Sequence, residues 1–353
     1  MTLDIDGRHG EGGGSIVRFS IAFAALLNRS VRVRQIRANR PRGGGLRPQH
    51  LTGVQLITQL TGGTLVGGQV GSTDLTYHPP VDEPPTPDEV DVEITTAGSV
   101  GLVFQALQLA MAQPHSRKTV NVRGGATYGA WAPSVDFIRK VTIPALERFG
   151  YRPSVEVHRE GYYPTGGAKV ILVFHPAQPL QPLHHTTQSP FQTIFGRSVA
   201  SNHLRRAKVA ERQANSAEKI LKKAFPSVDF DIQPVYVDSS NPGSGLTIWT
   251  DTIVPFGKSG VGKKGLPAEK VGRLVADSFV DDWREGGAVD EHLSDQLIPA
   301  MALSPGSSLR LSTLSSHTQT NIWLAEQFLS VKFGTQTLPN EKGIILSSQA
   351  GPS

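Results

Sequence analysis

The chain has 353 residues, of which 38% are hydrophobic and 18% charged, so it has the composition of a globular protein with room for two domains. It has no cysteine, which excludes disulfides, thiolate metal sites and a cysteine nucleophile. No apolar run approaches the ~18 residues of a membrane helix, and the N-terminus lacks a signal-peptide pattern. We therefore expect an intracellular protein with no membrane association. The net charge of +5 is compatible with a polyanionic partner, but such a value is common at this length.

Three segments have the composition of buried helices. Residues 15–27 (SIVRFSIAFAALL) are apolar nearly all round, with one charge at Arg18. Residues 100–112 (VGLVFQALQLAMA) have only Gln105 and Gln108 as polar side chains, and residues 133–149 form the third helix. The alternating VRVRQIR segment predicts a strand with its arginines on one face. An arginine cluster begins there and comprises Arg32, Arg34, Arg37, Arg40, Arg42 and Arg47.

An internal repeat indicates the architecture. Residues 50–79 are typical of a helix, a Gly-Gly pair, a strand, a glycine-rich turn and a second strand, and residues 133–176 repeat this order. A third copy is expected from Leu311 onward, with a helix after His317. Helices that alternate with strand hairpins predict an α/β protein with several α+β layers.

The character of the sequence changes between the second and third copies. A connector rich in Pro, His and Thr is followed by alanines at helical spacing and by two strand-like segments. We therefore predict a smaller α/β domain at residues 183–277, inserted into a large domain made of residues 1–182 and 278–353.

The segment GEGGGSIVR, residues 10–18, carries the most informative local pattern. Glycines directly before an apolar helix resemble an anion-binding loop at a helix N-terminus. The dinucleotide fingerprint would need a glycine at Ser15. Glu11 would repel phosphate unless it held a metal ion, and Arg18 could clamp a phosphate oxygen. The alternative is a tight turn in which Glu11 is solvated.

Other motifs exclude some kinds of site. Gly257-Lys258-Ser259 resembles part of an NTPase phosphate loop, but Thr252 stands where that loop needs glycine, so we expect a solvated basic loop. No histidines have the spacing of a metal site. His317, in SSHTQTN, stands between an expected strand and the start of a helix.

Seven motifs occur together in one order: GEGGG…R, QHL, TAGS…Q, GGATY…P, YPTGG, DEHLSDQL and HxxTN. From Asp6 to Phe333 the chain thus resembles the RNA 3′-terminal phosphate cyclase family, in its eukaryotic-type, catalytically competent branch. The resemblance implies three repeated units like the C-terminal domain of bacterial translation initiation factor three, interrupted by a small inserted domain.

The resemblance also implies a chemistry that uses ATP with Mg²⁺ or Mn²⁺ on an RNA with a 3′-phosphate end. His317 would attack the α-phosphate of ATP and form a histidine–AMP. AMP would pass to the RNA 3′-phosphate, and the 2′-OH would displace it to leave a 2′,3′-cyclic phosphate. A neutral imidazole suits this role near pH 7.

The resemblance assigns further roles residue by residue. Glu11 would hold the metal and, with Arg18, lie near the triphosphate. The rest of the nucleotide site would comprise Gln105, His292, Asp295 and Gln296. The RNA phosphate would be bound by Arg40, Arg42, Gln49 and His50.

Three other functions remain open. A non-catalytic, ribosome-assembly branch of the same family lacks the nucleophilic histidine, so His317 disfavours it. An enolpyruvyl-type transferase shares related repeat units but has no use for that histidine. A generic RNA-binding module is disfavoured because only 7% of the residues are aromatic. A nuclear or cytosolic location is expected from the family, and a homodimer stays open.

Overall fold

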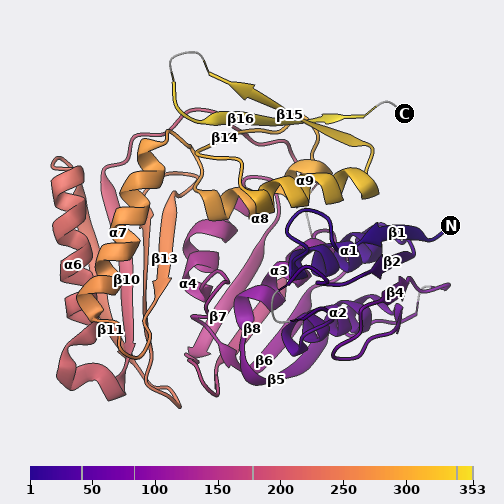
Figure 1. Cartoon of the computed structure of the whole chain (residues 1–353), viewed down its shortest axis with the longest axis horizontal. Helices are drawn as coiled ribbons and strands as arrows, with labels where there is room; N and C mark the ends of the chain where they lie inside the picture. Colours follow the sequence, from indigo (N-terminus) through magenta and orange to yellow (C-terminus); the bar gives the residue numbers. More distant parts are fainter. Residues whose placement is uncertain (41–42, 83, 177–178, 339–340, 352–353) are drawn as a thin grey trace.

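The computed structural model describes residues 1–353 except 41–42, 83, 177–178, 339–340 and 352–353. Within these residues there are four β-sheets of four strands each, and helices pack against all of them. Three sheets share one hydrophobic core, and the fourth has a core of its own (Figure 1). The α/β class predicted from the sequence is confirmed.

The three sheets of the larger core repeat one topology. In each unit the first two strands are parallel, and the last two form an antiparallel hairpin beside the second strand. The first unit comprises β1 (Leu3–Asp6), α1 (Gly14–Leu26), β2 (Val31–Arg34), α2 (Pro48–Thr61), β3 (Thr64–Val66) and β4 (Leu75–His78). The second comprises β5 (Glu89–Ser99), α3 (Val100–Ala110), β6 (Lys118–Ala126), α4 (Val135–Phe137), η1 (Ile138–Thr142), α5 (Ile143–Glu147), β7 (Pro153–Arg159) and β8 (Lys169–Phe174). The third comprises β9 (His184–His185), α8 (Glu291–Leu303), β14 (Ser308–Leu311), α9 (Ser316–Phe328), β15 (Val331–Thr337) and β16 (Ile344–Ala350).

The sequence pattern captures only the second half of each unit. Each unit also has a first strand and a first helix, as in β1 and α1, before the helix and hairpin expected from residues 50–79 and 133–176. The third copy expected from Leu311 is present as α9 and the β15–β16 hairpin, but the complete unit begins at β9, which pairs with β14. Its first strand is only two residues long and is separated from α8 by the inserted residues, so no periodicity reveals it.

The helices of the three units meet in the middle of the molecule, with their sheets outside (Figure 1). All eleven residues of α3 are buried, and α3 contacts α1, α2 and α8. Helix α9 packs on both α8 and α1. A helix that is apolar all round fits such a position, since every face is covered. This arrangement brings the loop before α1 close to the start of α9. None of the described helices is long and apolar enough to cross a membrane.

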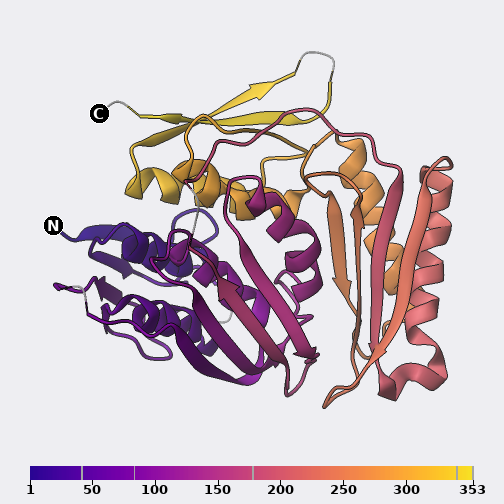
Figure 2. The same cartoon turned by 180° about the vertical axis from the view of Figure 1, so that it is seen from behind.

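The fourth sheet belongs to the inserted residues and stands at one side of the molecule, with α6 at its outer edge (Figures 1 and 2). Its strand order is β11-β10-β12-β13, and α6 and α7 pack side by side on one face. The elements are β10 (Thr193–Ser201), η2 (Asn202–Ala207), α6 (Val209–Ala224), β11 (Asp229–Val237), β12 (Ser244–Thr250), β13 (Gly257–Val261) and α7 (Ala268–Arg284). The expected boundary at residue 277 falls inside α7, whose Phe279 and Val280 belong to this core. We therefore propose that the inserted unit ends after α7.

A buried ionic network joins the inserted sheet to the second unit. Arg197 on β10 donates to Asp136 on α4 and to Glu160, with 2.9 Å between Arg197 Nη1 and Glu160 Oε1. The Tyr128 hydroxyl donates to Asp136 over 2.8 Å and contacts Thr247 on β12. Burial raises the pKa of Glu160, and the Asp136 charge raises it further. The network holds the inserted unit in one position against the large core.

Candidate active site

His317 lies in the first turn of α9, where hydrogen bonds of its neighbours fix the start of the helix. Ser315 caps the helix by accepting a hydrogen bond from the Thr318 backbone N–H at 3.1 Å. Thr318 Oγ1 lies 3.3 Å from Ser294 Oγ on α8, and Asn321 donates to the Asp295 carbonyl at 2.9 Å. The His317 side chain stays 52% exposed. The imidazole is therefore fixed at its base and open to a ligand.

Glu11 connects the two ends of the chain at this histidine. Its Oε2 lies 3.1 Å from His317 Nε2 and 3.3 Å from Arg40 Nη2. The Ser316 hydroxyl donates to the other carboxylate oxygen. One carboxylate thus orients the imidazole and an arginine at the same point, and the expectation of a solvated Glu11 in a tight turn does not describe it.

The glycines around Glu11 allow this close approach. Gly10 has a φ of +54°, and a Cβ there would lie 2.4 Å from Thr320 Oγ1 on α9. A Cβ on Gly14 would lie 2.2 Å from His50 Nε2. A side chain at either position would push the loop away from α9 or from the start of α2. His9 adds a further contact, because its ring stacks on Trp323 of α9 at 3.7 Å between centroids.

Positive charge converges beside this loop. Arg18, Arg37 and Arg40 each have a buried Nε with no hydrogen-bond partner among the described residues. Arg18 is 6% exposed, its Nη2 lies 3.4 Å from Gln105 Oε1, and burial lowers its pKa to about 10. Burial and the nearby charge of Arg18 lower the pKa of His50 to about 3, so this imidazole is neutral. Buried donors without partners point to an anion as the missing acceptor.

Three residues of α8 were expected at the nucleotide, and they do not all lie at the site. Asp295 lies near Arg18: burial raises the pKa of Asp295 well above its usual range, and the charge of Arg18 opposes this. His292 keeps an exposed surface, although burial lowers its pKa. Gln296, in contrast, is buried, accepts from Thr142 Oγ1 at 3.0 Å and donates to the His292 carbonyl at 2.8 Å. Both ends of its amide are engaged in the core, so the structure does not bring Gln296 to the site.

Only some of the residues expected at the RNA phosphate lie at the site. Arg40 and His50 lie at the site, as described above. Gln49 is half-buried beside the start of α3, where a Cβ on Gly98 would lie 3.5 Å from its Cβ. Arg42 lies outside the described residues.

The expectation of a solvated basic loop at Lys258 is wrong. Lys258 is 3% exposed on β13, and its Nζ lies 2.7 Å from Asp282 Oδ2. Asp290 lies close by, caps α8 through the N–H groups of His292 and Leu293, and has its pKa raised to about 7 by burial. A buried lysine needs such acidic partners, and they stand 24 and 32 residues away, beyond the reach of a local motif.

Two residues lie at the site that the sequence analysis did not single out. Arg37 belongs to the arginine cluster; it has a left-handed φ of +58°, and its charge helps to lower the pKa of His50. Ser316 precedes the histidine and could have been suspected from the SSH motif. A surface cavity of about 610 Å³ is lined by residues of α2 and β3 such as Gln55 and Gln59, and none of the site residues lines it.

The sequence of this chain matches one protein family over most of its length. Residues 9–335 match the family model described as RNA 3′-terminal phosphate cyclase. Proteins called RNA 3′-terminal phosphate cyclase are similar in Methanosarcina barkeri (40% identity, covering 94% of this chain and 96% of the relative) and Methanothermobacter thermautotrophicus (41%, 93% and 95%). The relative from Thermococcus onnurineus, with the same name, is 39% identical, and the match covers 96% of this chain and 97% of that protein.

These relatives are archaeal, and the eukaryotic-type branch stays a prediction. A solved EPSP synthase from Acinetobacter baumannii covers 99% of this chain and 64% of its own, with a TM-score of 0.30 and 10% identity, and carries no argument. The family match spans all three repeated units and the inserted unit, from the glycine loop to β15. This chain therefore belongs to the RNA 3′-terminal phosphate cyclase family.

Proposed function

We propose that this protein uses ATP to convert an RNA 3′-phosphate into a 2′,3′-cyclic phosphate through a histidine–AMP on His317. The observation that carries the proposal is the convergence of His317 and Glu11 with three arginines whose buried Nε atoms have no partner among the described residues. A nucleophile beside a preformed anion site is what nucleotidyl transfer needs.

The reaction divides into three displacements. A neutral ring nitrogen of His317 attacks the α-phosphorus of ATP, a P–N bond forms, and pyrophosphate leaves. An oxygen of the RNA 3′-phosphate then attacks the same phosphorus, and the P–N bond breaks to give an RNA–AMP anhydride. Finally the 2′-OH attacks the 3′-phosphorus, loses its proton and displaces AMP.

The roles of the side chains follow from their placement. Glu11, 3.1 Å from His317 Nε2, orients the imidazole. Arg18 and Arg40 stabilise charge on the phosphate oxygens, and Arg37 adds positive potential beside them. His50 stays neutral and supports the glycine loop where it approaches Gly14. His292 and Asp295 are proposed at the nucleotide, and Gln49 at the RNA end.

Divalent metal is a further part of the proposal. The described residues include no group of three His, Cys, Asp or Glu side chains that could hold a metal alone. Mg²⁺ is commonly held by one or two carboxylates together with substrate phosphates and water, so Glu11 fits a metal shared with ATP. Bound Mg²⁺ or Mn²⁺ would neutralise charge on the phosphate oxygens.

The test is incubation with α-labelled ATP and Mg²⁺ or Mn²⁺ without RNA, followed by denaturing electrophoresis. The wild type should carry an acid-labile label that His317→Ala lacks. His158→Ala is a matched control, since His158 is also an exposed histidine paired with a glutamate, with 3.3 Å between His158 Nε2 and Glu156 Oε1. Label in His317→Ala, or none in the wild type across metals and pH values, would refute the proposed nucleophile. An unlabelled wild type would favour the non-catalytic, ribosome-assembly function.

A further inference from the structure

Trp131 has an unusual placement for a large apolar side chain. It is 100% exposed, whereas the three other tryptophans of the chain are partly buried. Its φ of +64° lies in the left-handed region, which a bulky residue adopts only where its surroundings impose it. Exposed tryptophan in a strained backbone indicates that the fold presents this ring for contact.

The loop that carries Trp131 is anchored on both sides. The Thr127 N–H donates to the Gly161 carbonyl at 3.0 Å, and the Val135 N–H returns to the Thr127 carbonyl at 2.8 Å. Ser134 Oγ lies 3.1 Å from Thr247 Oγ1 and 2.8 Å from Ser259 Oγ on the inserted sheet. The ring therefore projects from a fixed loop, and little conformational entropy opposes binding to it.

The same loop lies against the edge of the candidate active site. A Cβ on Gly129 would lie 3.2 Å from the Cβ of Ser99, and a Cβ on Gly101 would lie 2.2 Å from the Pro133 carbonyl oxygen. These contacts place the loop at the start of α3, beside Gly98, which Gln49 approaches. Further along α3, Gln105 contacts Arg18 on α1.

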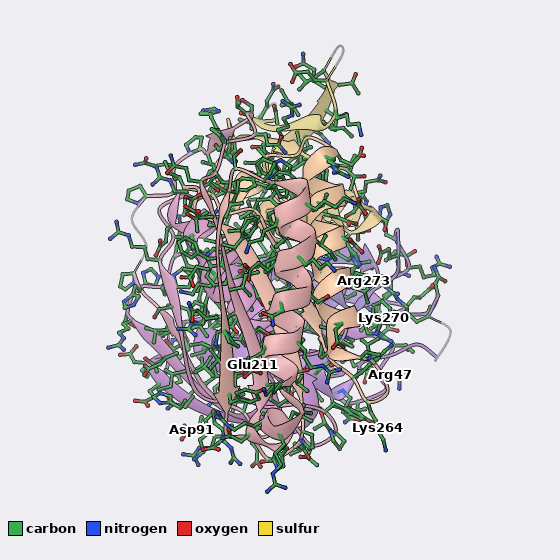
Figure 3. The ribbon with its side chains drawn as sticks, turned by 90° about the vertical axis from the view of Figure 1, so that its left-hand side faces the viewer. Arg47, Asp91, Glu211, Lys264, Lys270 and Arg273 are labelled. Carbon is green, nitrogen blue, oxygen red and sulfur yellow. The ribbon has the colours of Figure 1, made fainter. Side chains whose placement is uncertain are left out.

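Basic side chains of the large and inserted units lie on one side of the molecule (Figure 3). Arg47, two residues before Gln49, lies on the same side of the molecule as Lys264, Lys270 and Arg273 of the inserted unit (Figure 3). These last three side chains are exposed and form no ion pair within the described part of the chain. This positive charge attracts the backbone phosphates of an RNA strand whose 3′ end is bound by Arg18 and Arg40.

We propose that Trp131 stacks on a nucleobase close to the 3′ end of the RNA. The inference rests on the proposed function, and it assigns a base contact that the phosphate-binding residues do not supply. The bases of single-stranded RNA are unstacked and offer their faces to aromatic side chains, whereas duplex RNA does not. A stacking contact accepts every base, so it binds ends without selecting a sequence.

The experiment measures the dissociation constant of a fluorescent single-stranded oligoribonucleotide with a 3′-phosphate, by anisotropy. Trp131→Ala should weaken binding about tenfold, which is within the range for loss of one base stack, and Trp131→Phe should restore most of it. Val81→Ala is the control, because it removes another fully exposed apolar side chain in the loop after β4. It should leave binding unchanged.

A second experiment uses three RNAs, each with an abasic site at a different one of the last three nucleotides. At one position the abasic RNA should bind wild type about as weakly as Trp131→Ala binds intact RNA, with no further loss when both changes are combined. Equal sensitivity to the abasic site in both proteins, or unchanged binding in Trp131→Ala, would overturn the proposal. Loss of RNA-free adenylation in Trp131→Ala would overturn it too, by placing the ring at ATP. A wild type that binds RNA but never adenylates would refute the proposed function and still decide the role of Trp131.

Discussion

Glu11 shows why single residues at this site cannot be replaced by chemically similar ones. Its carboxylate contacts His317, Ser316 and Arg40 at once, although Ser316 is 305 residues away in the chain. Glutamine would keep the shape but lose the charge that attracts Arg40, and aspartate would fall short of His317. The sequence suggests a role for Glu11, but it cannot show these three partners.

His50 makes folding stability depend on pH. Its folded pKa of about 3 lies below the ordinary 6.5, so between these values the unfolded chain binds a proton that the folded chain does not. Stability is therefore lost as the pH falls from about 6.5 towards 3, and at pH 5 the loss from this group is ~2 kcal/mol. The measurement is the free energy of unfolding at pH 7 and pH 5 for wild type and His50→Gln. If both proteins lose the same amount, His50 is not the group responsible.

At the scale of elements, the start of α1 depends on the absence of a side chain at Gly14. Alanine favours a helix by about 1 kcal/mol over glycine, but its Cβ would lie 2.2 Å from the buried His50 ring. Overpacking of ~1–3 kcal/mol outweighs that gain, so we expect Gly14→Ala to lower the unfolding free energy and to slow adenylation.

Two variants test this steric explanation. Gly334→Ala on β15 is the control, since nothing lies within 4 Å of a Cβ there, and it should be close to neutral. Adding His50→Ala to Gly14→Ala should remove the penalty of the added methyl group. A Gly14→Ala protein as stable as wild type would contradict the close approach.

At the scale of the whole molecule, the Arg197 network holds the inserted unit against the second unit. Arg197→Met would leave Glu160 buried without its cation, and Asp136 with only the more distant Arg139, at 3.7 Å. We expect a loss of ~3–5 kcal/mol in unfolding free energy, because unpaired buried charges are strongly destabilising. Arg212→Met is the matched control: Arg212 and Glu269 are 42% and 49% exposed, and such pairs contribute about 0–1 kcal/mol. Equal losses in denaturant titrations of the two variants would show that the network does not hold the units together.

The sequence predicts the parts of this fold that have local signals. The buried helices α1 and α3 and the hairpins of the first two units follow from composition and glycine spacing. The two-residue β9 and the burial of Lys258 do not, because both depend on partners far along the chain. At the site, the motifs name His317, Glu11 and Arg18, but the side to which Gln296 turns is set by Thr142, in another unit.

The contact between Glu11 and His317 also bears on how the protein is made. Glu11 lies in the glycine loop before α1 and His317 at the start of α9, so the ribosome synthesises these two residues far apart in time. At roughly 5–20 residues per second, the N-terminal loop waits about 15–60 s for its partner. In the proposed mechanism, a nascent chain therefore has no nucleophile to accept AMP until residue 317 has been translated and α9 has packed against the glycine loop.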